Sequence, residues 1–118
     1  LSNNGVGVEL WASSDAVISG NTFSDNAEGV ELSNSGGNTF YHNNFINNTD
    51  QVISFNSASM WNNSYPSGGN YWSHYVGNDT YSGPFQNMPG SDGIGDMPHN
   101  STENEKDHYP LMTPYDET

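Results

Sequence analysis

Apolar and polar positions recur at a constant spacing along the first part of the chain, residues 1–55. Valines, large apolar residues and asparagines all follow this spacing. The clearest series are Val8, Val30 and Val52; Leu1, Phe23 and Phe45; and Asn4, Asn26 and Asn48. A fixed period of about 22 residues is typical of repeat proteins, in which each repeat is one structural unit.

Within one repeat the apolar residues alternate and do not form a helical stripe. Val6, Val8 and Leu10 are each two residues apart, so they share one face of a strand. Asn, Asp, Ser and Gly separate the short apolar runs and favour turns, because they tolerate positive φ or bond their own backbone. Three short strands and three corners per repeat predict an all-β fold, a parallel β-helix with about 22 residues per coil.

Stacked coils would place equivalent residues directly above one another. We therefore expect interior stacks of the valine and phenylalanine series, with Leu10 above Leu32 and Ile18 above Phe40. The asparagines at 4, 26 and 48, and those at 21 and 43, should form ladders whose amides bond along the stack, as stacked Asn does in cross-β structures.

The exact period ends after about residue 55, and a Gly- and Asn-rich segment follows. We expect coils in residues 1–55 and a C-terminal cap in residues 56–118, together forming one structural domain. An aromatic cluster at the start of this cap has two interpretations: it closes the top of the core, or it forms a platform on which sugars stack. Its members are Trp61, Tyr71, Trp72 and Tyr75.

The charge of the chain is strongly one-sided. The chain has fourteen carboxylates and a single basic residue, Lys106, which gives a formal net charge of −13. This excess excludes nucleic acid and anionic lipid as natural partners and favours cations. The chain has no cysteine, so it has neither disulfides nor thiolate metal sites. No apolar run is as long as a membrane-spanning helix requires, so we expect no membrane insertion.

The chain begins without Met and in the middle of a repeat, so we interpret it as a processed form or a fragment. An uncovered coil end exposes unpaired strand edges. We expect further coils or a second copy to cover it, so a homo-oligomer or filament through the open N-terminal coil is the predicted assembly.

A calcium site is predicted in the cap, where two carboxylates bracket a Gly-x-Gly turn. Asp92 and Asp96 are these carboxylates, and Asp79 and Asn87 are the further candidate ligands. Ca²⁺ prefers hard oxygen ligands from carboxylates, amides and backbone carbonyls. The alternative is that these aspartates only cap backbone amides of the turn.

Four Asn-x-Ser/Thr sequons are candidate glycosylation sites, at Asn47, Asn62, Asn78 and Asn100. Together with the acidic composition they favour an extracellular or cell-surface protein.

Three segments of the cap resemble the C-terminal signature of the NosD-like parallel β-helix family, which is abundant among secreted and surface proteins of methanogenic archaea. They are residues 68–75 (GGNYWSHY), 91–96 (SDGIGD) and 107–112 (DHYPLM). The resemblance implies a right-handed β-helix with a C-terminal cap. The chain departs from that signature at His74, where Asp is usual, and at residues 97–99, where Thr-Pro-Tyr is usual.

What the resemblance implies for function leaves several hypotheses. NosD proteins are named for accessory roles in copper loading of nitrous oxide reductase, and related domains bind or cleave carbohydrates. A β-helix lyase needs Arg or Lys, and the chain offers Lys106 alone. A hydrolase needs paired acids, and Glu9 and Glu31 are a candidate pair because they would stack on adjacent coils. Copper would need imidazole and thioether ligands. The candidates are His42, His74, His99, His108, Met60, Met88, Met97 and Met112.

We therefore expect a non-enzymatic structural protein of the cell surface whose cap binds Ca²⁺. A carbohydrate-binding module, or an inactive relative of β-helix polysaccharide enzymes, is the alternative, and a copper-binding accessory protein is a third hypothesis.

Overall fold

The computed structural model describes residues 5–102 and 105–115. Every regular element in these residues is a β-strand, which confirms the all-β class. No helix in this part of the chain is long and apolar enough to cross a membrane.

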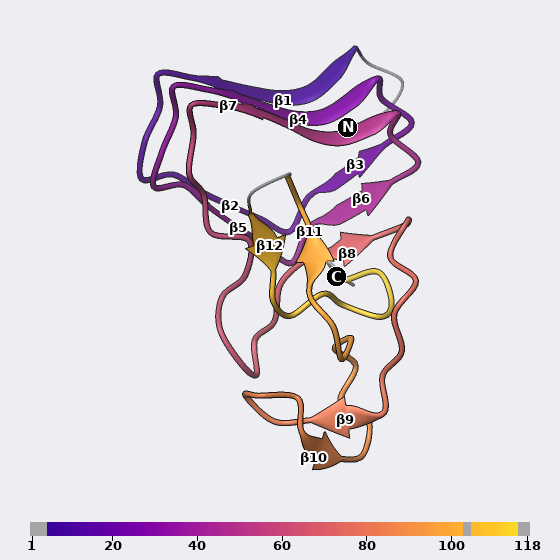
Figure 1. Cartoon of the computed structure of the whole chain (residues 1–118). Helices are drawn as coiled ribbons and strands as arrows, with labels where there is room; N and C mark the ends of the chain where they lie inside the picture. Colours follow the sequence, from indigo (N-terminus) through magenta and orange to yellow (C-terminus); the bar gives the residue numbers. More distant parts are fainter. Residues whose placement is uncertain (1–4, 103–104, 116–118) are drawn as a thin grey trace.

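Each repeat supplies one strand of six residues and two strands of three residues (Figure 1). The long strands pair with one another, and so do the short ones, because they occupy equivalent places in successive repeats. The strands are β1 (Val6–Trp11), β2 (Val17–Ser19), β3 (Thr22–Ser24), β4 (Glu28–Ser33), β5 (Thr39–Tyr41), β6 (Asn44–Ile46) and β7 (Asp50–Phe55).

All pairings among these strands are parallel, in the orders β1-β4-β7, β2-β5 and β3-β6. Partners in register are one repeat apart, as in Val8, Val30 and Val52. The predicted stacks at Leu10 and Leu32 and at Ile18 and Phe40 are confirmed by the same register. Leu1 and Asn4 lie outside the described residues.

The core runs along the inside of the repeats and ends in the cap. Phe23 and Phe45 are fully buried, with ring centroids 5.2 Å apart, and Trp72 stacks on Phe45 at 4.2 Å. Val30 and Leu32 complete the buried face of β4. Full burial of such a side chain contributes about 1.5–3 kcal/mol, so this narrow stack is the main apolar support of the fold.

The asparagine ladders are also confirmed. The backbone N–H of Asn21 donates to Oδ1 of Asn43 at 3.1 Å, and that of Asn26 donates to Oδ1 of Asn48 at 3.0 Å. The first ladder continues further than the sequence suggested, because the N–H of Asn43 donates to Oδ1 of Asn70 at 3.1 Å. Each rung satisfies a backbone amide at a corner, where no strand partner exists.

The backbone conformation of the corners also repeats from one repeat to the next. Ala12, Asn34 and Asn56 all have positive φ, at 51°, 50° and 49°, and Asp25 and Asn47 form a second such series at 56° and 54°. The left-handed region is tolerated best by Gly, Asn and Asp, which explains the composition of the corners. Ala12 is the exception and sits in this conformation without a polar side chain.

Strand pairing continues beyond the last exact repeat. Strand β8 (Tyr71–Trp72) lies parallel to β6, and its residues are 27 positions after their partners. Met60 forms a parallel bridge with Thr39, so the strand position next to β5 is also occupied. Because residues are inserted between these points, a search for a constant period does not find this continued pairing.

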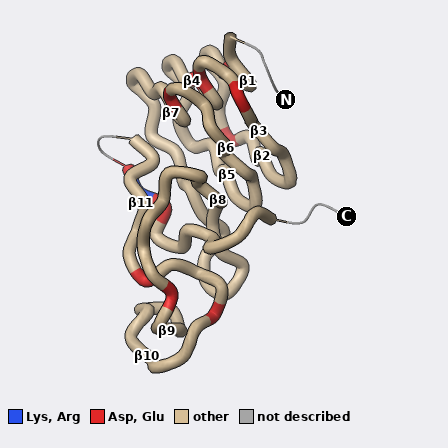
Figure 2. The backbone as a smooth tube through the Cα atoms, turned by 90° about the vertical axis from the view of Figure 1, so that its right-hand side faces the viewer, with Lys and Arg blue, Asp and Glu red and all other residues tan. Residues whose placement is uncertain are grey.

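The remaining strands are two-residue pieces in the loop-rich segment that follows. They form two antiparallel pairs, β9 with β10 and β11 with β12. Their bounds are Tyr81–Ser82 for β9, Met88–Pro89 for β10, His99–Asn100 for β11 and Lys106–Asp107 for β12. Acidic residues lie along both the repeats and the cap, and Lys106 is the single basic residue among them (Figure 2).

Candidate functional site

The aromatic cluster closes the core. Trp61 and Trp72 are each 1% exposed, and their ring centroids lie 5.9 Å apart beneath the last repeat. Trp61 and Trp72 therefore complete the core and offer no open face to a sugar. Tyr71 and Tyr75 are half-buried, so for these two rings the sugar-stacking interpretation stays a prediction.

Each buried tryptophan donates its indole N–H to a carboxylate from the C-terminal segment. Trp61 Nε1 donates to Glu105 Oε1 at 2.9 Å, and Trp72 Nε1 donates to Asp107 Oδ2 at 2.9 Å. Asp107 is fully buried and also accepts the backbone N–H of Asn70 at 2.7 Å and of Tyr109 at 3.0 Å. It therefore ends the ladder that runs through Asn21, Asn43 and Asn70.

Burial raises the pKa of Asp107 to about 6, although the hydrogen bonds from Trp72, Asn70 and Tyr109 act in the opposite direction. The carboxylate fits because residue 69 is glycine, and a Cβ there would overlap the Asp107 oxygens. The sequence did not single out Asp107, since its donors at Asn70 and Trp72 lie 37 and 35 residues away along the chain.

The predicted calcium ligands lie in one loop region but bind backbone amides. Asp79 accepts the N–H groups of Asp92 at 3.2 Å and of Gly93 at 2.7 Å. Asp92 accepts the N–H of Ile94 at 3.0 Å and the side-chain amide of Gln86 at 2.9 Å. These contacts agree with the alternative in which aspartates cap the amides of the turn.

Asp96 binds a different stretch of backbone. Its carboxylate accepts the N–H groups of Thr80 and Tyr81, each at 2.9 Å, and the Thr80 hydroxyl at 2.9 Å. Desolvation raises the pKa of Asp96, but the hydrogen bonds from Thr80 and Tyr81 outweigh it, so the pKa lies below its ordinary value. Asn87 is exposed next to β10. Within residues 5–102 and 105–115, no group of three His, Asp or Glu side chains is arranged to hold a metal ion.

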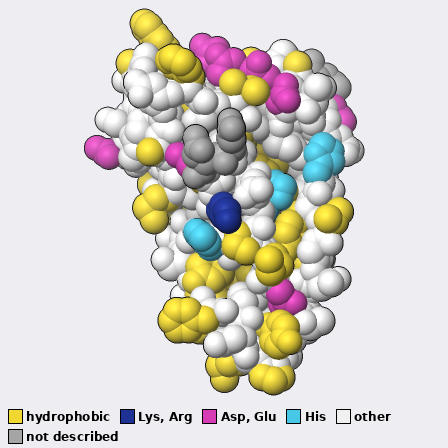
Figure 3. Space-filling model, in the orientation of Figure 1, with side chains coloured by type: hydrophobic (Ala, Val, Ile, Leu, Met, Phe, Trp, Pro, Cys, Tyr) yellow, Lys and Arg dark blue, Asp and Glu magenta, His cyan; other side chains and the backbone are white. Residues whose placement is uncertain are grey.

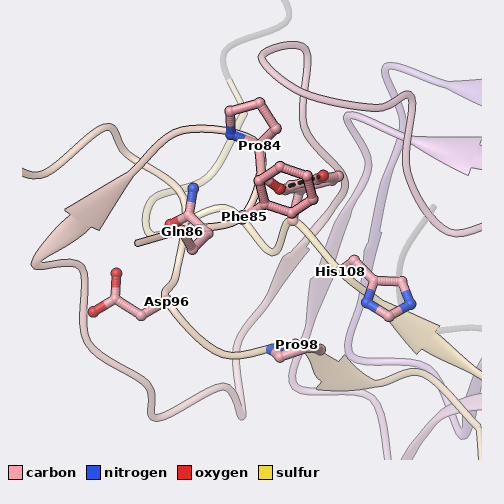
Figure 4. Close-up of a pocket in the computed structure, with 7 residues that line it drawn as sticks. Pro84, Phe85, Gln86, Asp96, Pro98 and His108 are labelled. Carbon is pink, nitrogen blue, oxygen red and sulfur yellow. Dashed lines mark hydrogen bonds between the residues drawn. The ribbon is translucent and has the colours of Figure 1, made fainter. Parts of the chain in front are cut away.

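A first cleft of about 340 Å³ opens in the cap and combines an exposed aromatic ring with polar groups (Figure 4). Phe85 is 85% exposed at its rim. Most of the polar side chains already have partners, since Gln86 binds Asp92 and the Tyr109 hydroxyl donates to the Pro84 carbonyl. The cleft is lined by Pro84, Phe85, Gln86, Asp96, Pro98, His108 and Tyr109.

A second cleft of similar volume, about 340 Å³, brings two imidazoles and a thioether together. His74 follows β8, whereas Met97 lies just before β11 and His99 is the first residue of β11. Tyr75, Val76, Pro98 and Asn100 also line this cleft. Figure 3 shows histidine and hydrophobic side chains gathered over the cap.

Two contacts hold the segments of the second cleft together. The Tyr75 hydroxyl donates to the Met97 carbonyl at 2.6 Å, and it accepts the Met97 N–H at 3.3 Å. The His99 ring stacks on Trp72 with centroids 4.7 Å apart. Burial lowers the pKa of His99 to about 4, and the charge of His74 adds to this effect, so the His99 ring is neutral at pH 7.

The other two histidines lie elsewhere. The His42 ring stacks on Tyr115 at 4.2 Å and bonds the Ser67 carbonyl at 2.7 Å, so it is a structural residue. His108 lines the first cleft. In the sequence all four histidines are copper candidates, but they are not grouped. The grouping depends on how the loop-rich cap folds, and the sequence pattern does not reveal this.

The four predicted glycosylation sites lie at or near the surface. Asn47, Asn78 and Asn100 are exposed, and Asn62 is half-buried, with its side-chain oxygen accepting the Ser64 N–H at 2.9 Å. Their glycosylation stays a prediction.

The pair of stacked glutamates is confirmed as a feature of the sheet, with Glu9 opposite Glu31 in register. A hydrogen bond with Glu28 raises the pKa of Glu31, and desolvation and the charge of Glu28 add to this, while a hydrogen bond with Glu9 lowers it. Glu9 on β1 is exposed and Glu31 on β4 is half-buried.

The comparison with protein families identifies the chain. A family model described as periplasmic copper-binding protein (NosD) matches residues 1–77. The chain belongs to the NosD family. Among curated proteins and solved structures, none matches it. The NosD match covers the repeats, β8 and His74, and it ends before Met97 and His99.

Proposed function

We propose that this NosD-family chain is a non-enzymatic structural module of the cell exterior, built as a short right-handed parallel β-helix that joins a second copy end to end. The observation that carries the proposal is the strand register. Parallel partners lie one repeat apart in three separate sheets, as successive coils of a β-helix require.

Unpaired strand edges support the assembly part of the proposal. In the described residues, β1, β2 and β3 each pair with a strand on one side only. Large apolar side chains are exposed on two of them, Trp11 on β1 at 72% and Val17 on β2 at 63%. An open edge of this kind is a template for further strands, which a second copy of the chain would supply.

The family description supports the location. NosD proteins are described as periplasmic, and an envelope-exposed or extracellular site agrees with this description and with the acidic composition. A polar surface rich in Asn and Ser, with exposed sequons, fits the same environment.

Calcium remains our proposal for the cap. Asp79 and Asp92 meet in one loop, and a carboxylate that accepts one or two N–H groups keeps further lone pairs for a cation. A rise in melting temperature on adding Ca²⁺, absent in Asp92→Asn, would support the site. An unchanged melting temperature in the native chain would remove it, and the scaffold proposal does not depend on it.

Light scattering after size exclusion, with electron microscopy of the same fractions, tests the assembly. We expect concentration-dependent self-association, which Trp11→Asp weakens by placing a like charge on an already acidic edge. Phe85→Asp is the matched control, because it changes a similarly exposed aromatic residue in the cap. A chain that stays monomeric at high concentration would refute end-to-end assembly, and glycan-array binding would then test the carbohydrate-binding alternative.

Copper binding is a second candidate function, and one specific observation favours it. The family is described as copper-binding, and His74, Met97 and His99 of this chain line one cleft. Imidazole and thioether are side chains that copper prefers. Uptake of copper by the purified chain, measured by metal analysis after dialysis, would test this function without reference to where the metal sits.

A further inference from the structure

We propose that His74, Met97 and His99 form a binding site for a single monovalent copper ion at the edge of the cap. This inference goes beyond the scaffold, and it rests on the copper-binding candidate by naming the residues and the oxidation state.

The chemistry of the donor set selects the ion. Two imidazole rings and one thioether line the cleft, and among the described residues no carboxylate does. Soft thioether ligands suit Cu⁺, whereas Ca²⁺ and Mg²⁺ require oxygen ligands. The calcium candidates Asp79, Asp92 and Asp96 lie outside this cleft and already bind amides.

The donor atoms are free to bind a ligand. In the part of the chain that the structure describes, neither ring of His74 and His99 has a hydrogen bond from the protein, and the Met97 side chain is 66% exposed. His42 is different, because Ser67 and Tyr115 occupy its ring. The two histidines of the cleft are thus the pair with unused nitrogens and a common opening.

The backbone around the donors is held in place before any metal arrives. The Tyr75 hydroxyl contacts both the N–H and the carbonyl of Met97, and Trp72 supports the His99 ring from within the core. His74 lies in a turn closed by the N–H of Tyr75 donating to the Trp72 carbonyl at 2.9 Å. Because both segments are anchored, binding would order few side chains, and preorganisation of this kind strengthens binding.

The net charge of the chain acts in the same direction. A formal charge of −13 with one basic residue raises the local concentration of cations without supplying a carboxylate to the cleft. The acidic residues of the whole chain therefore attract cations, whereas the imidazole and thioether groups of the cleft select copper among them.

An anaerobic competition titration of Cu⁺ alone against a chromogenic chelator tests the proposal, combined with X-ray absorption of the loaded protein. We expect one Cu⁺ per chain, with one sulfur and two nitrogen neighbours. Three variants each remove one donor while keeping the packing: His74→Gln, Met97→Leu and His99→Phe, the last of which retains a ring on Trp72. Each should weaken binding about tenfold or more.

Matched controls change the same residue types outside the cleft, His108→Gln and Met88→Leu, and these should leave the affinity unchanged. Copper uptake that none of the three donor variants weakens would overturn the site while leaving the copper-binding candidate in place. A native chain that takes up no Cu⁺ would overturn both. Equal affinity for Zn²⁺, or absorption data without a sulfur neighbour, would overturn the assignment of a monovalent copper site.

Discussion

Asp107 is a buried carboxylate that supports the closed end of the core, although the sequence gives no local sign of this role. Its carboxylate is fully buried and accepts hydrogen bonds from the Asn70 backbone, the Trp72 indole and the Tyr109 backbone. Asp107→Ala would leave these three N–H groups buried without an acceptor. The variant therefore tests whether the C-terminal segment holds the repeats closed.

Two opposing contributions determine how far Asp107→Ala lowers the free energy of unfolding. A buried donor without a partner costs about 1–3 kcal/mol, so three such donors cost about 5 kcal/mol. Removing the carboxylate also relieves the cost of burying its charge. The pKa of Asp107 is raised from 3.8 to about 6, a difference that corresponds to about 3 kcal/mol at neutral pH. We expect a net loss of about 2 kcal/mol in the free energy of unfolding at pH 7.

The raised pKa of Asp107 also predicts how the stability difference between the native chain and Asp107→Ala depends on pH. Because burial raises the pKa of Asp107 above its unfolded value, the folded native chain binds a proton between about pH 6 and pH 4, which the unfolded chain does not. This contribution to native stability is present below about pH 4 and is lost as the pH rises through 6. The difference between the native chain and Asp107→Ala should therefore grow to about 4 kcal/mol near pH 4.

Urea unfolding followed by tryptophan fluorescence at several pH values measures this, because Trp61 and Trp72 are buried in the native state. Asp50→Ala is the control, since Asp50 is exposed on β7, and it should change the stability by about 0.5 kcal/mol or less at pH 7. If the difference between the native chain and Asp107→Ala shrinks as the pH falls, the hydrogen bonds to the carboxylate outweigh burial and the reasoning is wrong.

Further predictions concern the repeats and the loop. Ala12→Asn should stabilise the chain by about 0.5–1 kcal/mol in thermal unfolding, because Ala12 has positive φ where Asn34 and Asn56 stand in the next repeats; a lower melting temperature would contradict this. Phe45→Ala should cost about 3–5 kcal/mol in urea unfolding, because Phe45 is fully buried in the aromatic stack, and a loss under about 1 kcal/mol would show that the stack is dispensable. Asp96→Asn should destabilise the chain at pH 7, and the difference should vanish as the pH falls below 4, because the native pKa lies below its ordinary value; a difference that persists at low pH would place the effect elsewhere.

The repeats could be predicted from the sequence because their pairing depends on equal spacing. Any two residues one repeat apart become neighbours, so the valine and phenylalanine series fix the register of β1, β4 and β7 and of β3 and β6. Gly29 shows how strict the spacing is, because a Cβ there would lie 2.5 Å from the Gln51 carbonyl oxygen. Local residue type and global fold agree throughout this part of the chain.

The continuation of the fold could not be predicted in the same way, because an insertion lengthens the spacing between β6 and β8. The pattern of an asparagine two positions before an aromatic residue does persist, since Asn43 and Phe45 correspond to Asn70 and Trp72. A search for that pattern, without a fixed period, would have found β8. The clefts carry no such signal, because His74 and His99 meet only through the path of a loop-rich segment.

The chemistry of the ladder explains why it ends at a carboxylate. Oδ1 of Asn43 accepts the N–H of Asn21 on one side, and the backbone N–H and side-chain amide of Asn43 donate to Oδ1 of Asn70 on the other, so an asparagine ladder can continue in both directions. An ionised carboxylate accepts on both oxygens and donates nothing. Asp107 uses Oδ2 for Asn70 and Oδ1 for Tyr109, which folds the chain back across the end of the core.

Asp107→Asn tests this explanation directly. The amide keeps an oxygen for the Asn70 N–H, but its NH₂ group then faces the Tyr109 N–H, which becomes a buried donor without an acceptor. That cost of about 1–3 kcal/mol is close to the gain of about 3 kcal/mol from removing the charge, so overall stability should change little at pH 7. Amide hydrogen exchange separates the two terms. Exchange at Tyr109 should accelerate while exchange at Asn70 stays slow, whereas unchanged protection at both positions would show that the ladder does not need an acceptor-only end.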